Sequence, residues 1–296
     1  MNKKLLQQSA LDCLKQCEFA EQTVRNATGH AAWLALAFSR LDENKALHWL
    51  KDALANHREG GSVPASAPSS LPVYGWLLGH LYQTSKNKPA LLKEIRSVYC
   101  GIVALHQDLY TNYDLSRDGL IATAHGETSE GMTSSHTLTH YVEEPFFNTM
   151  LIWSNEHLIR IGGLLGEDVL ELIEWNDLAI WSMNKKLWDK NASCYLPYDL
   201  RRQSKTGTPS KNSFLPMAAG VPTQEQAEVM HESLLQQTLY PHEWTLNWFL
   251  YKGLLRYEMR ETAADLKRET LAAALPYPAD TIEKAAIALE WLCANR

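Results

Sequence analysis

The sequence predicts an all-α fold in which twelve helices close into a ring of six helical hairpins. Apolar residues recur at three- and four-residue steps along most of the 296 residues, which is the period of an amphipathic helix. No shift in composition marks a linker, so we expect one domain over residues 1–296. In such a ring, six inner helices are apolar on both faces and six outer helices on one.

The first helix is predicted over residues 2–25, where Leu5, Leu6, Leu11 and Leu14 share one face. The same pattern predicts the remaining eleven helices at residues 30–40, 43–58, 70–84, 88–110, 144–165, 167–189, 211–219, 223–237, 242–257, 260–273 and 279–295.

Residues that start or stop helices support several of these boundaries. Pro145 and Pro222 stand near helix starts, where a missing N–H costs nothing, and Gly166 separates two helices. Two long polar connections, at residues 111–143 and 190–210, are expected as loops. Long loops in a compact domain tend to carry function.

Charge and cysteine content limit the partners and the compartment. The 28 basic against 34 acidic residues give a net charge of −6 without a basic run, so we expect neither nucleic acid nor a membrane as partner. The N-terminus has no hydrophobic signal region, and five cysteines are an odd number without a CxxC pair. These features favour a cytoplasmic protein with reduced thiols.

Four segments occur in an order typical of one enzyme family. They read RDGLIATAHGETSEGM, EEPFFNTMLIWSNEHLIRIGGLLGED, KKLWDK and SFLPMAAGVPTQEQAEVM, at residues 117–132, 143–168, 185–190 and 213–230. Together they resemble the mannosylglycerate hydrolase-like branch of glycoside hydrolase family 63. The resemblance implies an (α/α)6 toroid whose central pocket takes a small glucosyl- or mannosyl-type glycoside, and inverting hydrolysis of that glycoside.

The chain departs from this family where the catalytic acid is expected. When Gly131 and Met132 are aligned, the family's acidic residue falls on Thr133, and a threonine hydroxyl cannot act as a general acid near neutral pH. Glu130 and Glu127 lie close by in sequence and are the best candidate catalytic carboxylates.

The second carboxylate of the family is also missing. Hydrolysis ordinarily needs two carboxyl groups, about 6.5 to 9.5 Å apart when a water must fit between them. The stretch that would supply the base is shortened to residues 274–284, where Asp280 and Glu283 are expected to cap and open the final helix.

Other side chains near the family's substrate-side segments are candidates for sugar binding. Aromatic faces stack on sugars, and the candidate substrate-binding residues are Trp33, His125, Thr133, Tyr198, Trp244 and Trp248. By contrast, Trp49, Trp76, Trp181 and Trp291 fall on apolar helix stripes and are expected in the core. We expect no metal, because His125, His136 and His140 match no standard ligand spacing, and no cofactor.

Two further alternatives remain open at this point. The chain can be an inactive descendant that binds a sugar or a protein partner, or a sugar isomerase or epimerase on the same toroid. Glu143 and Glu144, just before Pro145, are expected to favour the positive end of the following helix.

Overall fold

The computed structural model describes residues 3–20, 28–59, 72–127, 138–236, 243–273 and 281–293. In this part of the chain, all twelve predicted helices are present, and most boundaries shift by only a few residues. The predicted all-α fold is therefore confirmed. No helix in the described part is both long and apolar enough to cross a membrane.

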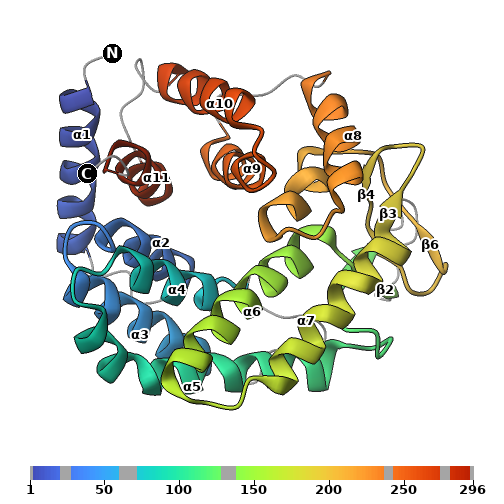
Figure 1. Ribbon diagram of the computed structural model, residues 1–296, viewed down its shortest axis with the longest axis horizontal. Coiled ribbons are helices and arrows are strands. Elements are labelled where there is room, and N and C mark those ends of the chain that lie inside the picture. The colour runs from blue at the N-terminus through green and yellow to red at the C-terminus, as the bar shows by residue number, and fades with distance from the viewer. Residues whose placement is uncertain are drawn as a thin grey trace, which may run out of the picture.

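Six helices form the outer layer and alternate along the chain with six inner elements (Figure 1). The outer helices are α1 (Lys3–Ala20), α3 (Glu43–Glu59), α5 (Lys88–Tyr113), α7 (Leu170–Ser182), α8 (Gln224–Leu235) and α10 (Arg260–Ala273). The inner elements are α2 (Thr28–Phe38), α4 (Tyr74–Thr84), α6 (Pro145–Leu165), the 3-10 helix η2 (Lys211–Ala219), α9 (Trp244–Arg256) and α11 (Ile282–Cys293).

The inner elements close into a ring. Each of them contacts the next, from α2 through α4, α6, η2, α9 and α11, and α11 packs against both α2 and α1. Figure 1 shows this closure, with the last helix returning to lie beside the first ones. The arrangement is the toroid of six hairpins that the sequence predicts.

Inner and outer helices differ in burial as expected for such a ring. Residues 285–291 of α11 are all buried, including Ala285, Leu289 and Trp291, because neighbours cover this helix on every side. The outer helix α10 buries only Ala263, Leu266, Thr270 and Leu271 among its described residues. Burial on all sides requires a nearly uninterrupted apolar sequence, as α11 has.

Two helix ends show how local sequence positions the inner ring. Pro145 begins α6, where its missing N–H leaves no hydrogen bond unmade. Gly166 ends α6 with φ at 70°, a left-handed conformation that glycine adopts without strain. Both features agree with the predicted boundaries.

The two long connections contain strands that the helical pattern did not predict. The first holds β1 (Ala122–Glu127) and β2 (Leu138–Glu143), and the second holds β4 (Cys194–Tyr195), β5 (Tyr198–Asp199) and β6 (Ser204–Lys205). Strand β3 (Trp188–Asp189) occupies the last two residues of the helix predicted over 167–189, which is wrong there. Strands β1, β2, β5 and β6 form one antiparallel sheet in that order. The strands β3 to β6 have two residues each, too few to produce a readable alternation.

Three of the four tryptophans predicted in the core are buried, namely Trp49, Trp76 and Trp291. The prediction for Trp181 is wrong, because its side chain is 55% exposed on the outer helix α7 and lies under the ammonium of Lys185. Helix α7 carries apolar residues around its whole circumference, so periodicity alone does not identify its inner face.

Candidate functional site

The long connections that the structure describes all lie at one end of the ring. Because inner and outer helices alternate in direction, every outer helix ends where the next inner element starts. The described connections at this end are residues 114–127, 138–144 and 183–210, whereas the opposite end has short turns such as residues 85–87 and 166–169. We call the end with the long connections the rim.

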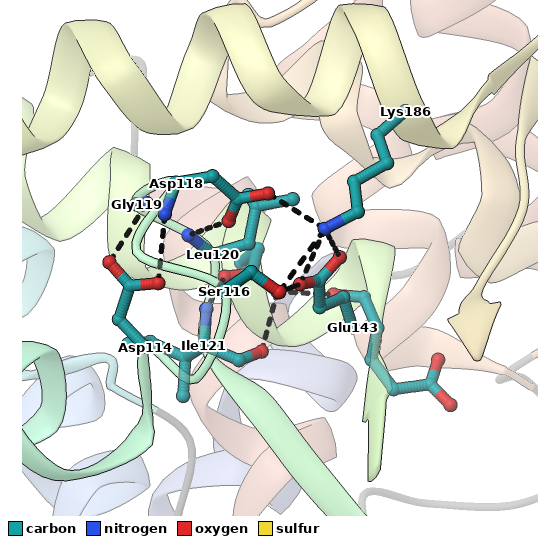
Figure 2. Close-up of polar contacts among 10 residues, drawn as sticks. Asp114, Ser116, Asp118, Gly119, Leu120, Ile121, Glu143 and Lys186 are labelled. Carbon is teal, nitrogen blue, oxygen red and sulfur yellow. Dashed lines mark hydrogen bonds and ion pairs between the residues drawn. The ribbon is translucent and has the colours of Figure 1, made fainter. Parts of the chain in front are cut away.

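A polar network holds together the rim segment of residues 114–121, the end of β2 and η1 (Met183–Leu187), the π-helical turn that follows α7 (Figure 2). The ammonium of Lys186 lies 2.7 Å from Oδ2 of Asp118 and 2.7 Å from Oε2 of Glu143. The hydroxyl of Ser116 donates to Oε1 of Glu143 at 2.8 Å. These four residues come from three of the family segments or lie immediately beside them.

Burial and the neighbouring charges have opposite effects on the pKa values of Glu143 and Lys186. Glu143 has no solvent exposure, and burial raises its pKa even though Lys186 and Ser116 stabilise the carboxylate. Burial lowers the pKa of Lys186, but hydrogen bonds to Asp118 and Glu143 outweigh burial and raise it. The ammonium of Lys186 also lies 4.8 Å from the ring centre of Tyr198.

The turn before β1 explains the Asp-Gly-Leu sequence of residues 118–120. The carboxylate of Asp114 accepts hydrogen bonds from the backbone N–H groups of Asp118 at 3.0 Å and Gly119 at 2.9 Å. Gly119 has φ at 81°, and a Cβ there would lie 2.8 Å from the backbone nitrogen of Ala179 in α7. Only glycine allows this turn and this approach to α7.

Asn148 fastens the start of the hairpin to the inner helix α6. Its Oδ1 accepts from the N–H of Ile121 at 2.8 Å, and its Nδ2 donates to the carbonyl of Ile121 at 3.0 Å. Asn148 is the asparagine of the Pro-Phe-Phe-Asn sequence in the second family segment. The amide of Asn148 therefore forms the two backbone hydrogen bonds of Ile121 that a neighbouring strand would otherwise form.

The fourth family segment is held by residues that lie outside the four segments, one of them directly before the third. The amide of Asn184 donates to the carbonyl of Val221 at 2.9 Å and accepts from the hydroxyl of Tyr195 at 2.8 Å. The hydroxyl of Tyr257 donates to the carbonyl of Pro222. The start of the fourth segment's second half is thus bound both to the turn that follows α7 and to the residue that follows α9.

The candidate catalytic positions lie in or beside the segment that joins β1 to β2. Glu127 is the last residue of β1 and is paired in register with Leu138, and His125 is paired with His140. Glu130 and Thr133 fall between these strands, outside the described residues, as does Asp280 before α11. Glu283 lies in the first turn of α11, as predicted.

The candidate aromatic residues occupy two different places. Tyr198, on β5, belongs to the network around Lys186. Trp244 and Trp248 are buried in the inner ring, 5% and 1% exposed, where Trp248 packs 5.4 Å from Trp76, and Trp33 is partly buried on α2. Their contact with a ligand stays a prediction.

The sequence reasoning missed the central pair of the network and misplaced Glu143. This residue ends β2 and faces Lys186, so its expected role at the start of the following helix is wrong. Glu144 occupies the N-cap position of α6, although its side chain forms no capping hydrogen bond. A signal for the pair was present, since Asp118, Glu143 and Lys186 all lie in family segments.

Comparison with known proteins decides the family. Residues 23–246 match the model of the mannosylglycerate hydrolase MGH1-like glycoside hydrolase domain. The chain belongs to the MGH1-like glycoside hydrolase family. It is also 27% identical to a mannosylglycerate hydrolase of Thermus thermophilus, over 73% of this chain and 71% of that protein.

Solved structures of this family and of other glycosidases share the fold. A family 63 mannosylglycerate hydrolase of Thermus thermophilus, in complex with Tris, matches with a TM-score of 0.78 at 17% identity, covering 97% of this chain and 99% of the other. Neutral trehalase Nth1 of Saccharomyces cerevisiae matches with a TM-score of 0.68 at 11% identity, covering 90% and 70%.

Proposed function

We propose that this member of the MGH1-like family binds a small glycoside at the rim and hydrolyses it very slowly or not at all. The observation that carries the proposal is the network of Asp118, Glu143 and Lys186. It anchors both strands of the hairpin whose connecting segment includes Thr133, the position aligned with the family's acid. A rim built on the family's segments but without the family's acid fits binding better than turnover.

The described carboxylates of the rim support low turnover. Asp118 and Glu143 share Lys186, and Glu243 at the start of α9 is paired with Lys211. In these ion pairs the carboxylate oxygens already accept hydrogen bonds from the ammonium groups, so they are not free to take a proton from an attacking water. Two carboxyl groups on opposite sides of the scissile bond are needed for ordinary hydrolysis.

The relatives indicate the ligand to test. The Thermus thermophilus relative is a mannosylglycerate hydrolase, and similar solved structures are complexes with glucose and with Tris and D-glycerate. We propose a glycoside of this size, with a hexosyl group and a small polar aglycone. A cytoplasmic location of the protein is part of the same proposal.

Isothermal titration calorimetry with mannosylglycerate, glucose and D-glycerate tests binding directly. We expect saturable binding of mannosylglycerate to the intact chain. Lys186→Met should weaken it by loosening the hairpin, whereas Lys185→Met, which changes an exposed neighbour, should leave it unchanged. Absence of binding by the folded protein, shown to be folded by circular dichroism, would refute the proposal.

A further inference from the structure

A second charged cluster lies at the end of the ring opposite the rim. Its members sit in the second half of inner helices or just beyond them, whereas the rim lies at the helix starts. The cluster consists of Arg40 after α2, His80 in α4, His157 and Arg160 in α6, Lys252 and Arg256 in α9, and Glu290 in α11.

The acids of this region already have partners. Glu290, 2% exposed, lies 2.9 Å from Nε2 of His80 and 2.9 Å from Nε of Arg40, and these groups lower its pKa to about 2 despite burial. Arg256 forms two hydrogen bonds with Glu156, at 2.8 and 3.0 Å. Each acid thus neutralises one arginine.

Two cations are left over. Among the described residues, no carboxylate forms an ion pair with Lys252 or with Arg160. The ammonium of Lys252 lies 5.0 Å from the ring centre of Trp248, and burial lowers its pKa, although Glu290 opposes this. A cation in the last turn of a helix is commonly stabilised by the unpaired carbonyl groups there. Lys252 stands one turn before Arg256, the last residue of α9, so the helix end does not account for its position.

His157 adds a neutral donor beside Arg160, close enough to Lys252 for the lysine charge to affect its pKa. Arg160 has only donors, so the contact of its Nη2 with Nδ1 of His157 at 2.9 Å makes Nδ1 the acceptor and leaves the ring proton on Nε2. Burial, followed by the charges of Arg160, His80, Arg256 and Lys252, lowers the pKa of His157 to about 3. The imidazole is therefore neutral near pH 7 and offers an N–H.

We propose that Lys252, Arg160 and His157 bind a small oxyanion, namely a phosphate or carboxylate group of a soluble metabolite. An anion would supply the acceptor that this set of donors lacks, with charge-assisted hydrogen bonds stronger than those to neutral acceptors. Solvent reaches the cluster, because Arg160 is exposed and Lys252 is partly exposed. The site is separate from the rim and does not depend on the proposed glycoside binding.

Calorimetric titration of the intact chain with inorganic phosphate and, separately, with acetate tests this site at constant ionic strength. We expect saturable binding of at least one anion, and the two titrations distinguish phosphate from carboxylate recognition. Lys252→Met should weaken binding at least tenfold. Lys185→Met is the matched control, because Lys185 also lies over a tryptophan, Trp181, at 4.3 Å.

A second variant covers the case in which Lys252→Met does not fold. Arg160→Gln keeps an N–H donor for His157 but removes the charge, and it should also weaken anion binding several-fold. The proposal is overturned if the wild-type chain shows no saturable binding of either anion, or if Arg160→Gln binds the anion like the wild type.

Discussion

Lys186 and Glu143 form a buried ion pair between η1, the π-helical turn that follows α7, and the end of β2, with Nζ 2.7 Å from Oε2. Glu143 has no exposure, and the exposed fraction of the Lys186 side chain is 20%. Since the same ammonium also binds Asp118, one cation holds two carboxylates, one just before β1 and one at the end of β2. This pair is the physical link between the outer layer and the candidate site.

Lys186→Met should destabilise the fold more than Lys186→Met combined with Glu143→Leu. The single change leaves a buried charge without its cation and should cost about 3 kcal/mol, whereas replacing both charges removes that penalty. The free energy of unfolding from urea titrations measures the difference. Equal stability of the single and the double variant would contradict the claim that Lys186 offsets a buried charge on Glu143.

Asn148→Ala should cost about 2 to 4 kcal/mol of stability, because it removes the two hydrogen bonds to Ile121 and leaves a buried backbone N–H and carbonyl without a partner. Asn112→Ala is the control, since Asn112 is exposed on α5 and bonds Asp108 on its own helix. Urea unfolding of the control should change by less than about 0.5 kcal/mol.

Stability should fall as pH decreases from about 6.5 towards 4.5, in part because of His106. Burial lowers the pKa of His106 to about 4, even though its hydrogen bond to Asn155 favours the charged form. The unfolded chain then binds a proton near pH 6.5 that the folded chain does not bind, so unfolding is favoured by acid.

The measurement is the slope of unfolding free energy against pH between about 5 and 6. His106→Gln should reduce this slope by about 1 kcal/mol per pH unit, close to the value for one proton. His48→Gln, at an exposed position of α3, should leave the slope unchanged. An unaltered slope in His106→Gln would show that this histidine does not contribute.

The helices could be predicted because their apolar period is long and regular, whereas the contacts of the site could not. The range predicted for α7, residues 167–189, included Lys186 without indicating what it binds. Its partner Glu143 lies 43 residues earlier, and their meeting depends on the register of β2 and on the turn at Gly119. Both strands of that hairpin occur in a polar connection that was expected as a loop.

The aromatic candidates show the same limit. Trp248 and Trp76 look alike in a helical pattern, and both are buried next to each other in the inner ring. Periodicity identifies the buried face of a helix, but it does not distinguish a side chain packed between helices from one that lines a pocket at the end of the ring.

Thr133→Asp alone should not produce a glycosidase. It returns an acid to the aligned position, but a single carboxyl group without a base leaves the attacking water unactivated, and such assistance is typically worth about 10² to 10⁴ in rate. Sugar release from mannosylglycerate, followed by chromatography, measures the outcome. Hydrolysis by this variant would mean that a second carboxylate is already in place.

The most direct test of the central claim is sugar release from mannosylglycerate by the wild-type chain under conditions where calorimetry shows the ligand bound. We predict no release above the uncatalysed background. Steady catalytic release that disappears in Glu130→Gln would contradict the claim and show that the hairpin has gained a new catalytic acid.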